Sequence, residues 1–134
     1  ANIVAGKSGI ASIEHFDTSG FNTRFGGSVK NFDISPYLNP KDARKMDLFI
    51  QYGMAAGAQA VQDSGIECTE ENAERIGVAI GSGIGGLPMI EHNHNALNKG
   101  GARRVSPFFV PGSIINMISG NMAIQHGFKG PNRE

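Results

Sequence analysis

The feature that most constrains the fold is an apolar strand, a glycine-rich turn and a helix in direct succession. Residues 76–80 (Ile-Gly-Val-Ala-Ile) form an apolar run too short for a helix of its own, which predicts a buried strand. Residues 81–86 (Gly-Ser-Gly-Ile-Gly-Gly) predict a tight turn, and residues 87–97 predict a helix. This succession is typical of α/β domains, so we expect the α/β class.

Helices are also predicted before and after this unit. Asn39-Pro40 favours a helix start and predicts a short helical turn over residues 41–45. Residues 46–63 predict the longest helix, which ends at Ser64-Gly65, and a further helix is predicted from Pro111 to about residue 127.

The longest predicted helix carries a face rich in small residues. Phe49, Gly53, Ala56 and Ala60 recur there at three- and four-residue spacing, and Gly53, Ala56, Gly57 and Ala60 are small. Such a face should let another helix or a sheet approach closely. Elsewhere the prediction is less regular, with a helix end closed by Gly6, a strand near residues 24–30, a helical turn from residues 69–72 and a loop at 98–104.

Composition narrows the class of protein. The length of 134 residues fits one domain, and 12 basic and 12 acidic residues cancel, so no global field attracts nucleic acid or a membrane surface. No apolar run is long enough to span a bilayer. The single cysteine, Cys68, excludes an internal disulfide and indicates a reducing compartment, so we expect a cytoplasmic protein.

The glycine-rich turn matches the G-x-G-x-x-G pattern of dinucleotide-binding proteins. That pattern also needs an acidic residue about 20 positions later, and no acidic residue lies between Glu91 and Glu134. We therefore prefer a tight turn packed near a pocket over a nucleotide site, and we expect no cofactor.

Two other groups of reactive side chains give weak signals. His92 and His94 are two residues apart, which on a helix points them in different directions, so we expect no metal site. Cys68 lies between Glu67 and Glu70, whose charges disfavour a thiolate, so it is a poor nucleophile.

Two clusters of basic residues stand out in a chain without net charge. Lys41, Arg44 and Lys45 fall on one helical face, and Arg103 and Arg104 are adjacent in a loop. They fit either solvated surface or docking spots for an acidic partner.

Four segments together resemble the bacterial β-ketoacyl-acyl-carrier-protein synthase II family. They are residues 41–53, 77–86, 106–111 and the Gly-Pro-Asn at 130–132, and their order and spacing also match. The resemblance implies a thiolase-like α/β fold, a mixed sheet flanked by helices, in an obligate homodimer. It implies fatty-acid elongation by decarboxylative Claisen condensation, with acyl carrier protein as partner.

The resemblance also implies roles for single residues. Lys41, Arg44 and Lys45 match positions that dock the carrier protein, and Arg103 and Arg104 match a second basic pair supplied by the dimer mate. Ile84 matches a residue that gates the acyl pocket, whereas Phe109 and Val110 match residues that reach into the partner's pocket.

The same resemblance implies that residues 1–134 are a partial N-terminal half. They lack the first strand and everything from the nucleophilic cysteine onward, so we expect no catalytic residue and no turnover by this chain alone. The alternatives are a non-catalytic carrier-protein-binding module and a nucleotide-binding α/β domain.

Overall fold

The computed structural model describes residues 2–133, which form two compact units with their boundary between Asp33 and Ile34. Expectations that involve Ala1 or Glu134 lie outside the described residues. In the first unit, β1 (Ile10–Ser12) pairs antiparallel with β2 (Phe25–Gly27), and Ala11 lies opposite Gly26. The strand predicted near residues 24–30 is confirmed at β2, whereas no strand was predicted at β1.

The predicted cap at Gly6 is also confirmed. Gly6 adopts a positive φ of 63°, its N–H donates to the Ile3 carbonyl, and the Lys7 N–H donates to the Asn2 carbonyl. This pair of hydrogen bonds closes a helical turn in the Schellman pattern.

The second unit begins with two helices in the predicted places. The short α1 (Pro40–Ala43) is followed by α2 (Leu48–Ser64), which Gly65 ends with a positive φ of 65°. Asn39 caps α1, since its side chain accepts the Asp42 N–H. Both the cap and the long helix are therefore confirmed, and their bounds move by no more than two residues.

The core lies between α2 and α5 (Met117–His126), and it is built from Ile50, Met54, Ile118 and Met122. Gly53 and Gly57 make room for it, because a Cβ at Gly53 would overlap Ile118 and one at Gly57 would overlap Met122. The predicted close packing is confirmed, but the predicted face was partly wrong, because Ala56 and Ala60 are exposed. The large side chains of α5 pack against the neighbouring stripe of α2, so that stripe is buried instead.

A second sheet joins two distant segments. After the 3₁₀ turn η1 (Ala73–Arg75), β3 (Val78–Ala79) pairs parallel with β4 (Asn132–Arg133). The strand predicted over residues 76–80 is confirmed at its centre, but its predicted burial was wrong, because Val78 is only half-buried and Ala79 is exposed. The described strands thus form two separate pairs, one antiparallel and one parallel, rather than one continuous mixed sheet.

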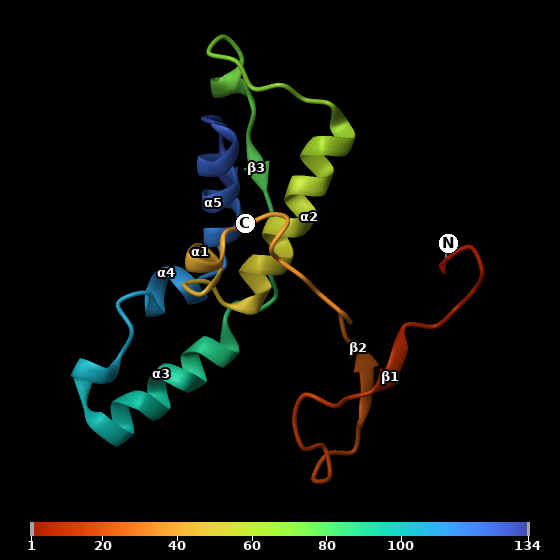
Figure 1. The fold of residues 1–134 in the computed structure, drawn as a ribbon, viewed down its shortest axis with the longest axis vertical. Helices are drawn as coiled ribbons and strands as arrows, with labels where there is room; N and C mark the ends of the chain where they lie inside the picture. The colour runs from red at the N-terminus through yellow and green to blue at the C-terminus, as the bar shows by residue number, and fades with distance from the viewer. Residues whose placement is uncertain (1, 134) are drawn as a thin grey trace. The chain divides into compact units, whose positions relative to one another are not determined.

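The helix α3 (Leu87–Gly100) follows the glycine-rich turn, as predicted, but is three residues longer than predicted. It therefore takes in the start of the loop expected at 98–104, and η2 (Ala102–Arg104) is a 3₁₀ turn. Figure 1 shows α3 leading away from the α2–α5 pair, after which the chain returns through η2 to α4 (Phe109–Ser113).

The single helix predicted from Pro111 to residue 127 was wrong. The structure has α4 and α5, separated by an extended Ile114 with ψ of 144°. The carbonyls that would continue α4 accept other donors, because the Gly112 carbonyl binds the Asp47 N–H and the Ser113 carbonyl binds the Gly86 N–H. Within residues 2–133, no helix is long and apolar enough to cross a membrane.

Candidate functional site

Residues 39–45, which carry the predicted docking cations and are called the docking segment below, are held by a short chain of hydrogen bonds. The Asn39 amide donates to Asp42 at 2.6 Å, and Lys45 Nζ donates to the other oxygen of Asp42 at 2.7 Å. The hydrogen bond from Lys45, followed by that from Asn39, lowers the pKa of Asp42 below its usual value. Asp42 is therefore ionised at neutral pH and holds Lys45 against the helix.

This pairing divides the predicted cationic face. Lys45 lies 5.4 Å from the centre of the Phe108 ring and is half-buried, whereas Lys41 and Arg44 are exposed. Within residues 2–133, neither Lys41 nor Arg44 makes a side-chain hydrogen bond or ion pair. Two cations are thus available to an incoming acidic partner, and the third is already engaged.

The second basic pair lies at the far end of α3. Arg103 and Arg104 are exposed in η2, and the Arg104 side chain lies over Gly100, where a Cβ would approach it within 2.6 Å. A cation is favourable here, because the carbonyl end of a helix carries partial negative charge. Since α3 has 14 residues, its two ends are about 20 Å apart, which separates this pair from the helix start near Asp47.

The glycine-rich turn is pressed against the end of α4. The Gly86 N–H donates to the Ser113 carbonyl at 2.9 Å, and Gly85 has a positive φ of 96°. A Cβ at Gly85 would lie 2.6 Å from the same carbonyl, so a side chain has no room there. The turn that carries Ile84 and the helix that carries Phe109 and Val110 are therefore neighbours.

The three predicted pocket residues differ in exposure. Ile84 is 69% exposed and Val110 is 57% exposed, while Phe109 is half-buried. Exposed apolar side chains on a turn and a short helix are available to cover an apolar chain.

The start of α3 is already occupied by a carboxylate. The Asp47 Oδ2 accepts the Met89 N–H at 2.8 Å, although the two residues are 42 positions apart. A pyrophosphate on a G-x-G-x-x-G turn would need this helix start. The geometry therefore disfavours the nucleotide-binding alternative and supports the tight-turn interpretation.

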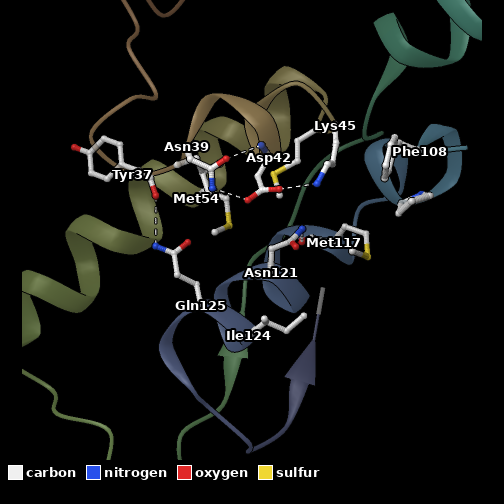
Figure 2. Close-up of a pocket in the computed structure, with 13 residues that line it drawn as sticks. Tyr37, Asn39, Asp42, Lys45, Met54, Phe108, Met117, Asn121, Ile124 and Gln125 are labelled. Atoms are coloured by element: carbon white, nitrogen blue, oxygen red, sulfur yellow. Dashed lines mark hydrogen bonds and ion pairs between the residues drawn. The ribbon is translucent and has the colours of Figure 1, made fainter. Parts of the chain in front are cut away.

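A pocket of about 510 Å³ opens beside the docking segment (Figure 2). Lys45 and Phe108 lie at one side, and α5 contributes Met117, Asn121 and Gln125. Sequence reasoning missed this pocket. Its lining comes from separate segments of the chain, so no local pattern in the sequence indicates it.

The remaining reactive groups lie outside this region. Cys68 Sγ donates to the Gly127 carbonyl at 3.3 Å, and His94 contacts the Asn98 amide on α3. Among residues 2–133, no three His, Cys, Asp or Glu side chains gather in a way that could hold a metal ion.

Comparison with known proteins gives the family. The model of the beta-ketoacyl synthase N-terminal domain matches residues 1–133. The chain is 65% identical over 130 residues to 3-oxoacyl-[acyl-carrier-protein] synthase 2 of Vibrio cholerae, covering 97% of this chain and 31% of that protein. The chain thus spans about a third of the relatives that it matches.

Solved structures agree with this result. A ketosynthase in complex with its type II polyketide acyl carrier protein is 26% identical with a TM-score of 0.70, over 76% of this chain and 29% of that one. A beta-ketoacyl synthase from Burkholderia phymatum is 21% identical with a TM-score of 0.72, over 94% of this chain and 31% of the other, and shows the fold alone. The predicted thiolase-like α/β fold is confirmed, and this chain belongs to the beta-ketoacyl synthase family as part of its N-terminal domain.

Proposed function

We propose that residues 1–134 are the carrier-protein-docking and pocket-lining part of a fatty-acid-elongating synthase that works in the cytoplasm. The observation that carries the proposal is the 65% identity to a 3-oxoacyl-[acyl-carrier-protein] synthase 2 over nearly the whole chain. In the proposed reaction, an acyl group is transferred from carrier protein to an enzyme cysteine. Malonyl-carrier protein then loses CO₂, its carbanion attacks the thioester, and the thiolate leaves.

The docking role rests on charge and exposure. Lys41 and Arg44 present two exposed cations on the segment beside the pocket, and Lys45 lines the pocket itself. Carrier proteins are acidic in this family, so opposite charge would steer the encounter. Because Arg103 and Arg104 lie at the other end of α3, we assign them to the docking site of a second subunit in a homodimer.

The pocket role rests on three apolar side chains carried by the glycine-rich turn and α4. Ile84 would gate the acyl chain of its own subunit, and Phe109 and Val110 would reach into the pocket of the partner subunit, in keeping with their exposed or half-buried side chains. The chemistry itself needs a nucleophile in an electropositive setting, and Cys68 does not provide one, since its thiol donates to a backbone carbonyl. We therefore expect no condensation by these 134 residues alone.

The test is a chimera in which this chain replaces the matching 130 residues of the Vibrio cholerae relative. The chimera should condense acyl- and malonyl-carrier protein. Lys41→Glu and Arg44→Glu should each raise KM for carrier protein roughly three- to tenfold at low salt, because each reversal turns an attraction into a repulsion. Arg75→Glu, an exposed cation in η1, is the matched control and should leave KM unchanged.

Two results would contradict the proposal. One is a folded chimera without activity, and the other is condensation by the 134-residue chain alone. A non-catalytic carrier-protein-binding module is the second candidate, favoured by the fact that both basic clusters lie in the unit 34–134 that holds the core. Carrier-protein binding by a folded but inactive chimera would select it.

A further inference from the structure

Asp47 lies where three functional segments of the second unit meet. It follows the docking segment directly, its side chain reaches α3, and its backbone reaches α4. The residue is only 7% exposed, although it carries a carboxylate. A charge is seldom buried unless donors satisfy it, so this position calls for an explanation.

The carboxylate acts as the cap of a helix that is distant in sequence. Gly86 occupies the cap position of α3 and has no side chain, and Asp47 Oδ2 supplies the missing acceptor for the Met89 N–H. Its negative charge also matches the positive end of the α3 dipole. Asp47 makes no such side-chain bond to its own helix, α2, so the buried carboxylate serves α3.

The backbone around Asp47 completes a tight joint. The Asp47 N–H donates to the Gly112 carbonyl at 3.0 Å, and the Gly86 N–H donates to the Ser113 carbonyl at 2.9 Å. A Cβ at Gly86 would lie 3.0 Å from Asp47 Oδ2 and 2.9 Å from the Ser113 Cα. The glycine-rich turn is therefore enclosed between Asp47 on one side and α4 on the other.

We propose that Asp47 is a positioning residue for acyl-chain selection: it fixes the turn that carries Ile84 against α4. This inference rests on the proposed function, because that function makes Ile84 the gate of the acyl pocket of its own subunit. If the carboxylate is removed, the Met89 N–H loses its acceptor and the turn can shift relative to α4. The expected effect is a change in which chain lengths are accepted, beyond any general loss of activity.

The experiment measures kcat/KM for short-, medium- and long-chain acyl-carrier proteins with the Vibrio cholerae chimera. Asp47→Ala should change the ratio of long-chain to short-chain kcat/KM by about ten- to a hundredfold, since displacing a positioned group by about 1 Å has effects of that size. Asp47→Asn keeps an acceptor oxygen and should restore the ratio most of the way. Asp63→Ala removes an exposed carboxylate from the other end of the same helix and is the matched control.

Each outcome decides the matter. If Asp47→Ala lowers kcat/KM for every chain length by one factor, Asp47 is merely structural and the proposal is overturned. If Asp47→Ala does not fold, Gly86→Ala probes the same joint from the opposite side, because its Cβ presses on both Asp47 and Ser113. An unchanged ratio in Gly86→Ala then overturns the proposal. An inactive wild-type chimera is a different failure, which overturns the proposed function together with this inference.

Discussion

The two units, 1–33 and 34–134, differ in how far they bury their large apolar side chains. In the first unit, the large side chains of Ile10, Phe21 and Phe25 are more than half exposed, and its strands have three residues each. In the second unit, Ile50 and Met54 are at most 1% exposed in the α2–α5 core. A short two-stranded hairpin cannot enclose a core, whereas two packed helices can. Stability should therefore reside in the second unit.

The sharpest test removes one buried side chain. Ile50→Ala should cost about 2–5 kcal/mol of unfolding free energy, because it leaves a cavity among Met54, Ile118 and Met122. Ile10→Ala removes the same atoms from a side chain that is 57% exposed and should stay within about 0.5 kcal/mol. Urea unfolding of the chimera measures both. Equal costs at the two sites would remove the contrast between the units.

The next test adds a methyl group to a glycine in each unit. Gly53→Ala places a Cβ into Ile118 and should destabilise by about 1–3 kcal/mol, despite the better helix propensity of alanine. Gly26→Ala in β2 meets only Ile13 at an ordinary 3.7 Å, so it should be neutral or stabilising by up to about 1 kcal/mol. Thermal melting separates the two. A neutral Gly53→Ala would mean that α2 and α5 are not closely packed.

A smaller effect is expected at a helix cap. Asn39→Ala removes the acceptor for the Asp42 N–H and a donor to the Asp42 carboxylate, so α1 should lose about 1 kcal/mol. Ser8→Ala removes the hydroxyl that accepts the exposed Ile10 N–H in the first unit. It should cost less free energy of unfolding, because water can take the place of the lost acceptor. Hydrogen exchange of the α1 and β1 amides is the measurement. A larger rise in β1 exchange on Ser8→Ala than in α1 exchange on Asn39→Ala would reverse the expected order.

The smallest effect distinguishes two carboxylates. The pKa of Asp17 is lowered by hydrogen bonds from Ser19, and that of Asp42 by Lys45 and then Asn39. Both folded pKa values lie below the ordinary 3.8, so each contribution to stability is complete above that pH and is lost as pH falls through the folded pKa. At 1 M salt the screening length is about 3 Å, which weakens attraction to a cation more than a neutral hydrogen bond.

Carboxyl NMR titrations at low and high salt check this difference. The pKa of Asp42 should rise toward its ordinary value in high salt, and the pKa of Asp17 should change little. A larger salt shift at Asp17 than at Asp42 would contradict the assignment of Lys45 as the main cause.

Local signals in the sequence predicted the elements well where the cause is local. The Asn39 cap, the Gly65 end of α2 and the strand before the glycine-rich turn all follow from neighbouring residues. The break between α4 and α5 could not be predicted, because its cause is a pair of hydrogen bonds from Asp47 and Gly86, which are remote in sequence.

The same distinction between local and remote causes applies to the candidate site. The ion pair of Asp42 with Lys45 was not predicted, although their three-residue spacing on a helix is a local signal for it, and Lys45 was instead grouped with Lys41 and Arg44. The roles of Ile84, Phe109 and Val110 came only from resemblance and stay predictions. The pocket beside Lys45 draws on Tyr37, Met54 and Gln125, which come from three separate segments, so no local pattern indicates it.

The parallel pairing of β3 with β4 has a consequence for how the protein is made. Val78 pairs with Asn132, which is translated 54 residues later. At about 5–20 residues per second, the edge of β3 waits roughly 3–11 s on the ribosome before its partner exists. During that interval the newly made strand is open to pairing with other nascent chains. Synthesis speed and chaperone access should thus govern the yield of this protein more than its final stability does.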